Sequence, residues 1–376
     1  MDTFLTNFAV FVHSFLILLA VLLLILVFII DKIAHRKDVW SDTIFALGVA
    51  YISRPIIDVQ AILFSWIQKQ LKLPLTESIL SDSVCILIGV FLLLVSFYLK
   101  KKDSQTNNKL PVLNMLGMQY QAYVSQRGCE NKLPKNEFDE KVIDFRILFD
   151  KTGQISEGDN KKICEMIKNE CSSFVSFTSN SECAYFTGMS PIPYEVYAGT
   201  FLNGSNVNEY LEFDSKNSKK FYKLEKTSAT QKELISPNPF HINETENIIE
   251  STELNLSIEV TSKISSGDLD QFQSFSSLKI GLQQNKDNLI REIEQLNSLK
   301  NRISCLMEEY GKKGINRIHI TAAIPSCLAV EIGKEIVQLG NRLPEVIVYH
   351  YVRTSEKKYP FGLIVNGSRK GELYHV

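Results

Sequence analysis

The stretch Ile318-His-Ile-Thr-Ala-Ala-Ile-Pro325 carries the pattern that decides the fold of the C-terminal part of the chain. A short strand runs into small residues and a proline, and a helix is predicted over residues 327–339, because Pro is favoured in the first turn of a helix. A strand-to-helix turn of this kind presents backbone N–H groups and the positive end of a helix dipole. It therefore favours an anionic ligand such as a phosphate.

An earlier stretch, Ala184-Tyr-Phe-Thr-Gly-Met-Ser-Pro191, has the same design. At one fixed offset four residues are identical in the two stretches: Thr187 and Thr321, Pro191 and Pro325, Val196 and Val330, and Gly199 and Gly333. The match favours an internal duplication, although four identities are also compatible with chance. Two such units would form a pseudo-symmetric anion site at the carboxyl ends of their strands.

Strands and helices alternate through the C-terminal two thirds of the chain, which favours Rossmann-like α/β layers. Strands are predicted at residues 142–149, 174–178, 258–264, 317–321 and 345–352. Helices are predicted at residues 159–169, 287–310 and 327–339, of which the second has an apolar stripe and is stopped by Gly311 and Gly314.

The first hundred residues are suited to a lipid bilayer. Residues 8–30 contain no charged side chain and are long enough to cross the hydrocarbon core as a helix. A later apolar stretch ends in Lys100-Lys101-Lys102. Region 1–102 is therefore predicted to be a membrane α-helical segment with helices at about 8–30, 42–67 and 80–99, followed by a soluble α/β domain.

The middle segment, residues 42–67, is interrupted by charges, so two spans and three spans both stay open. Three spans place Lys32 and Lys100 on the same side, in keeping with the positive-inside rule, and put the C-terminal domain in the cytoplasm. Arg54 and Asp58 then lie within the bilayer on one helix face and become candidate pore residues. The alternatives are an ion pair that only holds helices together, or a helix that lies in the interface.

Charge and motifs exclude several classes of function. The chain has 41 Lys and Arg against 42 Asp and Glu, so it lacks the cationic excess with which proteins bind long nucleic acids. The seven cysteines have neither CxxC spacing nor a nearby His in metal-site spacing, which predicts buried thiols and no metal. Because HExxH, GxSxG and Walker sequences are absent, we expect no catalytic residues and no enzyme.

The run that begins at Ile318, with Val346-Ile-Val-Tyr-His-Tyr351 and Tyr359 after it, resembles the C-terminal half of a SAVED domain. SAVED domains are similar to two fused CARF-like, Rossmann-like units, and the repeat described above fits that design. After the membrane region at 1–102 and a polar linker at 103–115, the resemblance implies a SAVED domain at 116–376 with halves of about 116–235 and 250–376.

SAVED domains sense cyclic oligonucleotides that CD-NTase enzymes make in bacterial anti-phage (CBASS) systems, and they are fused to effectors. The resemblance implies such an effector, multi-pass in the bacterial inner membrane with its C-terminal domain in the cytoplasm. Binding of a cyclic di- or trinucleotide would make the chain form homo-oligomers and open a pore in the bilayer or disrupt it, which causes abortive infection. The resemblance implies no cofactor.

The expected ligand limits which residues can bind it. Phosphates and flat bases require hydrogen-bond donors, cations and aromatic faces. Residues of these kinds near the predicted strand ends form the candidate ligand set: Ser190, Tyr194, Thr261, Ser262, Thr321, Ala323, Ser326, Tyr351 and Arg353. The alternative role of the Ser and Thr residues is helix capping, and that of Tyr351 is packing in the core.

Two other functions stay open from the sequence: a membrane-tethered nuclease or hydrolase, and a ligand-independent channel or scaffold. Turnover by the purified protein would favour the first, and a failure to bind any cyclic nucleotide would favour the second. His319 alternates with Ile318 and Ile320, which indicates a packed strand residue rather than a general base.

Overall fold

The computed structural model describes residues 91–98, 109–118, 123–131, 133, 137–149, 155–179, 181–226 and 242–375. The chain divides into two units, residues 1–108 and 109–376. Every strand described below belongs to the second unit.

In the first unit, the described residues 91–98 are helical. Within the described part of the chain, no helix is both long enough and apolar enough to cross a bilayer. The predicted spans at 8–30 and 42–67, with Arg54 and Asp58, lie outside the described residues, and so does most of the span at 80–99.

The first half of the second unit is a five-stranded sheet of order β2-β1-β3-β4-β5, in which β5 alone is antiparallel to its neighbour. Its strands are β1 (Lys109–Leu116), β2 (Glu137–Asp144), β3 (Ala184–Met189), β4 (Val207–Phe213) and β5 (Phe221–Lys223). Its helices are α5 (Val124–Arg127), η1 (Arg146–Leu148), α6 (Glu157–Thr178) and α7 (Ile192–Leu202).

The second half is a seven-stranded sheet of order β12-β11-β10-β9-β7-β8-β6. Its strands are β6 (Ile242–Asn247), β7 (Glu253–Glu259), β8 (Ser276–Leu282), β9 (Arg317–Ala323), β10 (Glu345–His350), β11 (Phe361–Ile364) and β12 (Leu373–Tyr374). Its helices are η2 (Ser266–Phe272), α8 (Ile293–Lys312), α9 (Ser326–Leu339) and η3 (Gly340–Arg342).

The two halves repeat one arrangement. Strands β8, β7, β9, β10 and β11 lie in the order of β2, β1, β3, β4 and β5, with the same parallel and antiparallel pairings. Helices α8 and α9 flank β9 in the chain as α6 and α7 flank β3. The predicted internal duplication is therefore confirmed, and β6 and β12 are additions at the edges of the second sheet.

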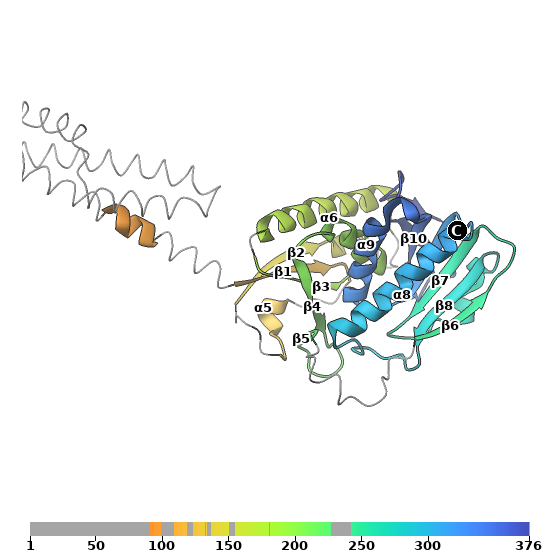
Figure 1. Ribbon diagram of the computed structural model, residues 1–376, viewed down its shortest axis with the longest axis horizontal. Helices are drawn as coiled ribbons and strands as arrows, with labels where there is room; N and C mark the ends of the chain where they lie inside the picture. Colours follow the sequence, from red (N-terminus) through yellow and green to blue (C-terminus); the bar gives the residue numbers. More distant parts are fainter. Residues whose placement is uncertain are drawn as a thin grey trace, which may run out of the picture. The chain divides into compact units, whose positions relative to one another are not determined.

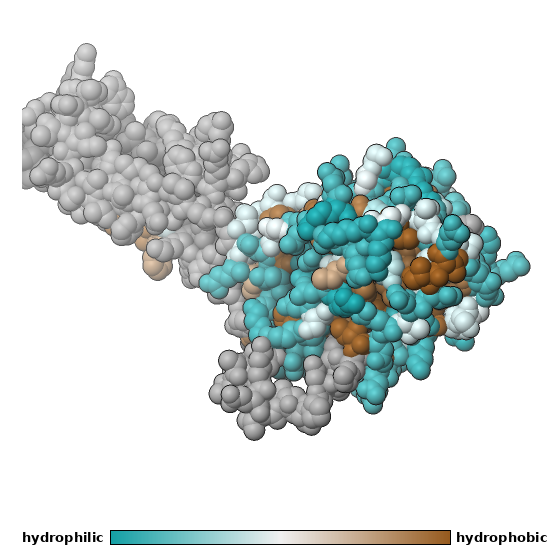
Figure 2. All heavy atoms as spheres, turned by 45° about the vertical axis from the view of Figure 1, so that its right-hand side comes forward, coloured by the Kyte–Doolittle hydropathy of each residue, from teal (hydrophilic) through white to brown (hydrophobic). Residues whose placement is uncertain are grey.

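Helices α7 and α9 hold the halves together. Helix α7 contacts β10 and β11 of the second half, and α9 contacts β3 and β4 of the first half. In Figure 1 α9 lies beside α8, between the strands of the first half and strands β6, β7 and β8. The largest hydrophobic core extends through both halves. Among the described residues of the second unit, the side seen in Figure 2 is mainly hydrophilic, with apolar side chains confined to small clusters.

The two helices cross at a pair of glycines. A Cβ built on Gly199 would stand 2.1 Å from the carbonyl oxygen of Val330, and one on Gly333 would stand 2.0 Å from the carbonyl oxygen of Val196. These four residues are two of the identical pairs of the sequence repeat, so the matched positions of the two halves touch each other. The close approach of the backbones requires glycine at both places.

Strand β1 is a central strand of the first sheet, and seven of its eight residues are buried. It begins at Lys109, the first residue of the second unit, so it starts within the interval 103–115 that was predicted as a linker. Its far end leads through Gly117 to Met118.

Two predicted strands are wrong in whole or in part. Residues 174–178 form the last turn of α6, because Phe174 and Thr178 continue the buried stripe of that helix. An aromatic and β-branched run in a final helical turn has the composition of a strand, which explains the error. The strand predicted at 142–149 ends at Asp144, where the chain turns into η1.

Other predicted boundaries are shifted. The strand predicted at 258–264 is β7, which begins and ends five residues earlier. The helix predicted over 287–310 begins at Ile293 and continues through Gly311 to Lys312. Gly314 follows it with a φ of +93°, a conformation that favours glycine. The strands at 317–321 and 345–352 and the helix at 327–339 are confirmed within two residues.

Gly333→Ala is expected to destabilise the second unit, because the new Cβ would overlap the carbonyl oxygen of Val196, a backbone atom that cannot rotate away. Overpacking typically costs about 1–3 kcal/mol, and a backbone clash belongs at the upper end of that range. Urea denaturation of residues 109–376 measures the change in the free energy of unfolding.

Gly158→Ala is the matched control. In the first turn of α6 its Cβ would meet only the Ser156 hydroxyl, at 3.9 Å, and alanine is the better helix former. Equal stability of the two alanine variants would contradict a tight helix crossing at Gly333.

Candidate ligand-binding site

A pocket of about 430 Å³ lies where the two halves meet, at the carboxyl ends of parallel strands. Strands β3 and β9 both end in it, and the first turns of α7 and α9 form part of its wall. The first half contributes Met118, residues 188–192 and Glu195, and the second half contributes residues 261–264, Asp268, residues 322–324, Ser326, residues 349–351 and Tyr359.

Six of the nine predicted ligand residues line this pocket: Ser190, Thr261, Ser262, Ala323, Ser326 and Tyr351. They come from both halves of the second unit and from the ends of four strands, β3, β7, β9 and β10. The structure therefore brings together residues that the sequence places far apart. Their contacts with a ligand stay predictions.

Tyr194 and Thr321 lie in the interior instead. The Tyr194 hydroxyl donates a hydrogen bond to Oδ1 of Asn160 at 2.8 Å. Thr321 is fully buried, and its hydroxyl forms hydrogen bonds with the side chains of Ser257 and Asn255 on the neighbouring strand. We therefore remove both residues from the candidate ligand contacts, because their polar atoms are used inside the fold.

Lys263 is a cation of the site that the sequence analysis missed. It is exposed on the loop after β7 and lines the pocket. Burial lowers the pKa of His350, the other basic side chain in the lining, to about 4, so Lys263 is the cation among the described lining residues at neutral pH. Lys263 was missed because the strand was predicted to extend to residue 264, whereas β7 ends at Glu259. Arg353 is exposed after β10 and is not part of the lining, so its role stays a prediction.

Each helix that begins at the pocket meets a buried carboxyl group. The Cys327 N–H in the first turn of α9 donates to Oε1 of Glu212 at 2.6 Å. At α7, Ser190 donates from its backbone N–H and from its hydroxyl to Oε1 of Glu195, at 3.0 and 3.1 Å. These carboxyls occupy donors that were predicted to be free for a phosphate, which corrects the simple picture of two empty helix ends.

Burial raises the pKa of Glu195 to about 8 and that of Glu212 to about 7, although the hydrogen bonds they accept lower both values. Near neutral pH the helix ends are therefore met by carboxyls that hold protons for part or most of the time. Their average negative charge is reduced accordingly, so they repel an anion in the pocket less than two fully ionised carboxylates would.

The remaining polar and aromatic groups suit an anionic, aromatic ligand. The buried Ser326 hydroxyl has no hydrogen-bond partner among the described residues. The Tyr351 side chain is 42% exposed, and its ring lies 5.5 Å from that of Tyr359 at a steep angle. Donors, one ammonium group and an accessible ring can bind phosphates and bases. The described residues contain no cluster of side chains that could hold a metal ion.

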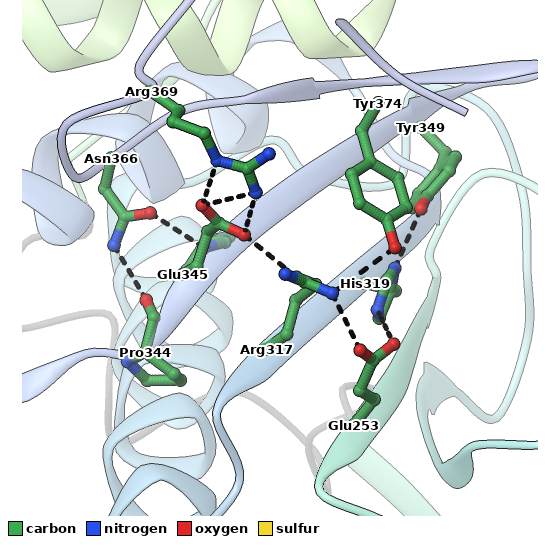
Figure 3. A network of polar contacts seen from close by, with 10 residues as sticks. Glu253, Arg317, His319, Pro344, Glu345, Tyr349, Asn366, Arg369 and Tyr374 are labelled. Carbon is green, nitrogen blue, oxygen red and sulfur yellow. Dashed lines mark hydrogen bonds and ion pairs between the residues drawn. The ribbon is translucent and has the colours of Figure 1, made fainter. Parts of the chain in front are cut away.

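A polar network of the second half includes Tyr349, a residue of the pocket lining (Figure 3). Nε2 of His319 donates to the carboxylate of Glu253 at 2.9 Å, and Nδ1 accepts from the Tyr349 hydroxyl at 2.8 Å. Arg317 bridges Glu253 and Glu345 with distances of 2.7 and 2.9 Å. The network fixes the ring of Tyr349, which lines the pocket, and His319 is fully buried as a packed strand residue.

Two fused α/β halves with one shared pocket at their strand ends define a double Rossmann-like domain. The chain belongs to the SAVED family, whose full description is "SMODS-associated and fused to various effectors sensor domain". The pattern of this family matches residues 167–365. The matched region begins inside α6 and ends just after β11. The resemblance inferred from the sequence is thereby confirmed for this domain.

The chain is similar to the solved structure of the Acinetobacter baumannii Cap4 SAVED/CARF-domain containing receptor with the cyclic trinucleotide 3'3'3'-cAAA, with 14% identity and a TM-score of 0.45 over 80% of this chain and 64% of that chain. The chain is also similar to the Moraxella osloensis Cap4 SAVED/CARF-domain containing receptor. The identity is 13% and the TM-score 0.41, over 79% of this chain and 63% of that receptor. The chain thus spans a little under two thirds of the length of these receptors. No protein of curated function matches it.

The stability of the domain is expected to fall as the pH drops from about 6.5 to about 4. Burial lowers the pKa of His319 to about 4, so the unfolded chain binds a proton in this range that the folded chain excludes. His319→Gln can keep hydrogen bonds to Glu253 and Tyr349 without titrating, so its thermal midpoint should fall less steeply with pH. Thermal unfolding at several pH values measures this. His375→Gln, at an exposed histidine, is the control. If the thermal midpoint of His319→Gln falls with pH as steeply as that of His375→Gln, the prediction is contradicted.

Proposed function

We propose that this chain is an effector of bacterial anti-phage (CBASS) defence, and that its SAVED domain binds a cyclic oligonucleotide made by a CD-NTase. The shared pocket is the observation that carries the proposal. Both halves contribute a strand end and the first turn of a helix to it, so a ligand built of repeating nucleotides can meet similar backbone geometry on either side.

The chemistry of the pocket supports a small cyclic ligand rather than a long nucleic acid. Its volume of about 430 Å³ is in the range of small-molecule sites. The hydroxyls of Thr261, Ser262 and Ser326 and the ammonium group of Lys263 are suited to phosphates, and Tyr351 is suited to stacking on a base. A net charge of −1 gives the chain no general affinity for polyanions.

The direct test is a calorimetric titration of the full-length chain in detergent, and of residues 109–376, with a panel of cyclic di- and trinucleotides. We expect one member of the panel to bind tightly and to increase the size of the protein in light scattering. If no member binds, the sensor function is contradicted, and the ligand-independent scaffold becomes the better hypothesis.

Lys263→Ala is expected to weaken binding of that ligand by about 1.5–3 kcal/mol, the value of a charge-assisted hydrogen bond to a phosphate. Lys161→Ala, on the exposed side of α6, is the control with the same loss of charge. Affinities that are equal in the two variants would place the phosphates elsewhere. If Arg353→Ala loses as much ligand affinity as Lys263→Ala, the loop after β10 also contacts the ligand.

We also propose that region 1–102 anchors the chain in the bacterial inner membrane, with the SAVED domain in the cytoplasm. The uncharged run at residues 8–30 supports this location. In this proposal the chain performs no reaction on its ligand. Ligand binding makes copies of the chain assemble, and the assembled membrane segments open a pore or disrupt the bilayer.

Arg54→Ala is expected to leave ligand binding unchanged and to weaken permeabilisation of the membrane, because it removes a charge from the segment proposed to line the pore. Dye release from liposomes that contain the protein measures permeabilisation after ligand is added. Arg36→Ala, in the predicted loop outside the bilayer, is the control. Dye release by Arg54→Ala equal to that of the control would remove Arg54 from the pore.

A further inference from the structure

Glu195 is a buried carboxyl group in the wall of the pocket, with 3% of the residue exposed. Both hydrogen bonds from Ser190 end on its Oε1 atom, so Oε2 takes part in neither of them. A Cβ built on Gly188 would stand 2.7 Å from both Glu195 Oε1 and Ser326 Oγ. The missing side chain of this glycine therefore lets the carboxyl of one half and the hydroxyl of the other face the same point.

No described cation forms an ion pair with this carboxyl. The ionisable group that acts on it is a second buried carboxyl, Glu212 on β4. The other ionisable groups around it are the Cys327 thiol beside Glu212 and the pocket residues Lys263, Asp268, His350, Tyr349, Tyr351 and Tyr359. An isolated negative charge in such a place is unfavourable. Burial first, and the nearby Glu212 as well, raise the pKa of Glu195 to about 8.

We propose that Glu195 in its uncharged form is a ligand-binding residue that donates a hydrogen bond to an acceptor atom of the cyclic oligonucleotide. The inference rests on the proposed function, because it assumes that this ligand occupies the pocket. Oε1 accepts both bonds from Ser190, so the proton belongs on Oε2, and a carboxylic acid then offers one O–H donor. The acceptor is a phosphodiester oxygen or a ring nitrogen of a base, and an ionised carboxylate would repel either.

The hydroxyl of Ser326 supports this position for the ligand. It is buried in the lining of the pocket and has no partner within hydrogen-bond distance among the described residues, although it lies near enough to Glu195 to lower the pKa of that carboxyl group. Such a group is unfavourable until a polar atom meets it. Glu195 and Ser326 belong to different halves, so a ligand that contacts both side chains would be bound by both halves at once.

The test is a titration of the full-length chain in detergent with the panel of cyclic oligonucleotides between pH 6.5 and 9. The affinity of the wild type should stay constant up to about pH 8 and then fall about tenfold per pH unit, because binding takes up one proton. Glu195→Gln carries an N–H donor at every pH, so its affinity should match the wild type at pH 6.5 and should not fall. Glu195→Leu has no donor and should bind weakly throughout.

Glu182→Gln is the matched control, because Glu182 is an exposed carboxylate that precedes β3 and is not part of the pocket lining. It should show the same pH profile as the wild type. Titration in buffers of different ionisation enthalpy counts the protons taken up. That number should approach one above pH 8 in the wild type and in Glu182→Gln, and zero in Glu195→Gln.

The outcomes separate this inference from the proposed function. A wild-type affinity that is constant from pH 7 to 9, or a Glu195→Gln variant that folds and does not bind, overturns the donor role and leaves the cyclic oligonucleotide site intact. A wild type that binds no member of the panel at pH 6.5 overturns both.

Modified ligands distinguish the two kinds of acceptor. One ligand carries sulfur in place of a non-bridging phosphate oxygen, and another carries carbon in place of a ring nitrogen of the base. The substitution that weakens binding to the wild type without weakening binding to Glu195→Leu marks the atom that Glu195 contacts. If every modified ligand affects the two proteins equally, the contact is overturned.

Discussion

The backbone contact between Gly199 and Gly333 is the constraint on which the rest of the domain depends. It places α7 and α9 side by side where the two halves of the second unit meet, and each helix packs on a sheet of the other half. Strands β3 and β9 pass into these helices within three residues, so fixing the helices also fixes the two strand ends. The pocket between those ends is thus a consequence of how the halves are joined.

The walls of the pocket are rigid for a different reason, which is electrostatic. On one side Glu253 and Arg317 position His319, and His319 holds Tyr349. At the helix ends, buried carboxyls accept the N–H groups of Ser190 and Cys327. Most polar groups are therefore committed to the fold. The few that are left, with a single lysine, suit one specific ligand better than anions in general.

The sequence was sufficient for the duplication, the long helices and the SAVED domain, because these depend on period and spacing. It was insufficient where the question is which side chains of a helix or strand point into the core and which reach the pocket. Helix α7 is buried on nearly all sides, so no polar stripe shows that Tyr194 points inward. Lys263 was hidden because β7 ends at Glu259 and not at Ile264. Glu195 was not predicted, because the sequence does not show that this carboxyl group in the first turn of α7 is buried.

Strand β1 runs from the residue where the second unit begins to the pocket. Lys109, where the unit begins, and Met118, at the pocket, are separated by a buried strand roughly 26 Å long. The chain that precedes Lys109 is thus joined to the amino end of β1, and the pocket lies beyond its carboxyl end. What precedes β1 can therefore differ in sequence while every residue that lines the pocket stays the same.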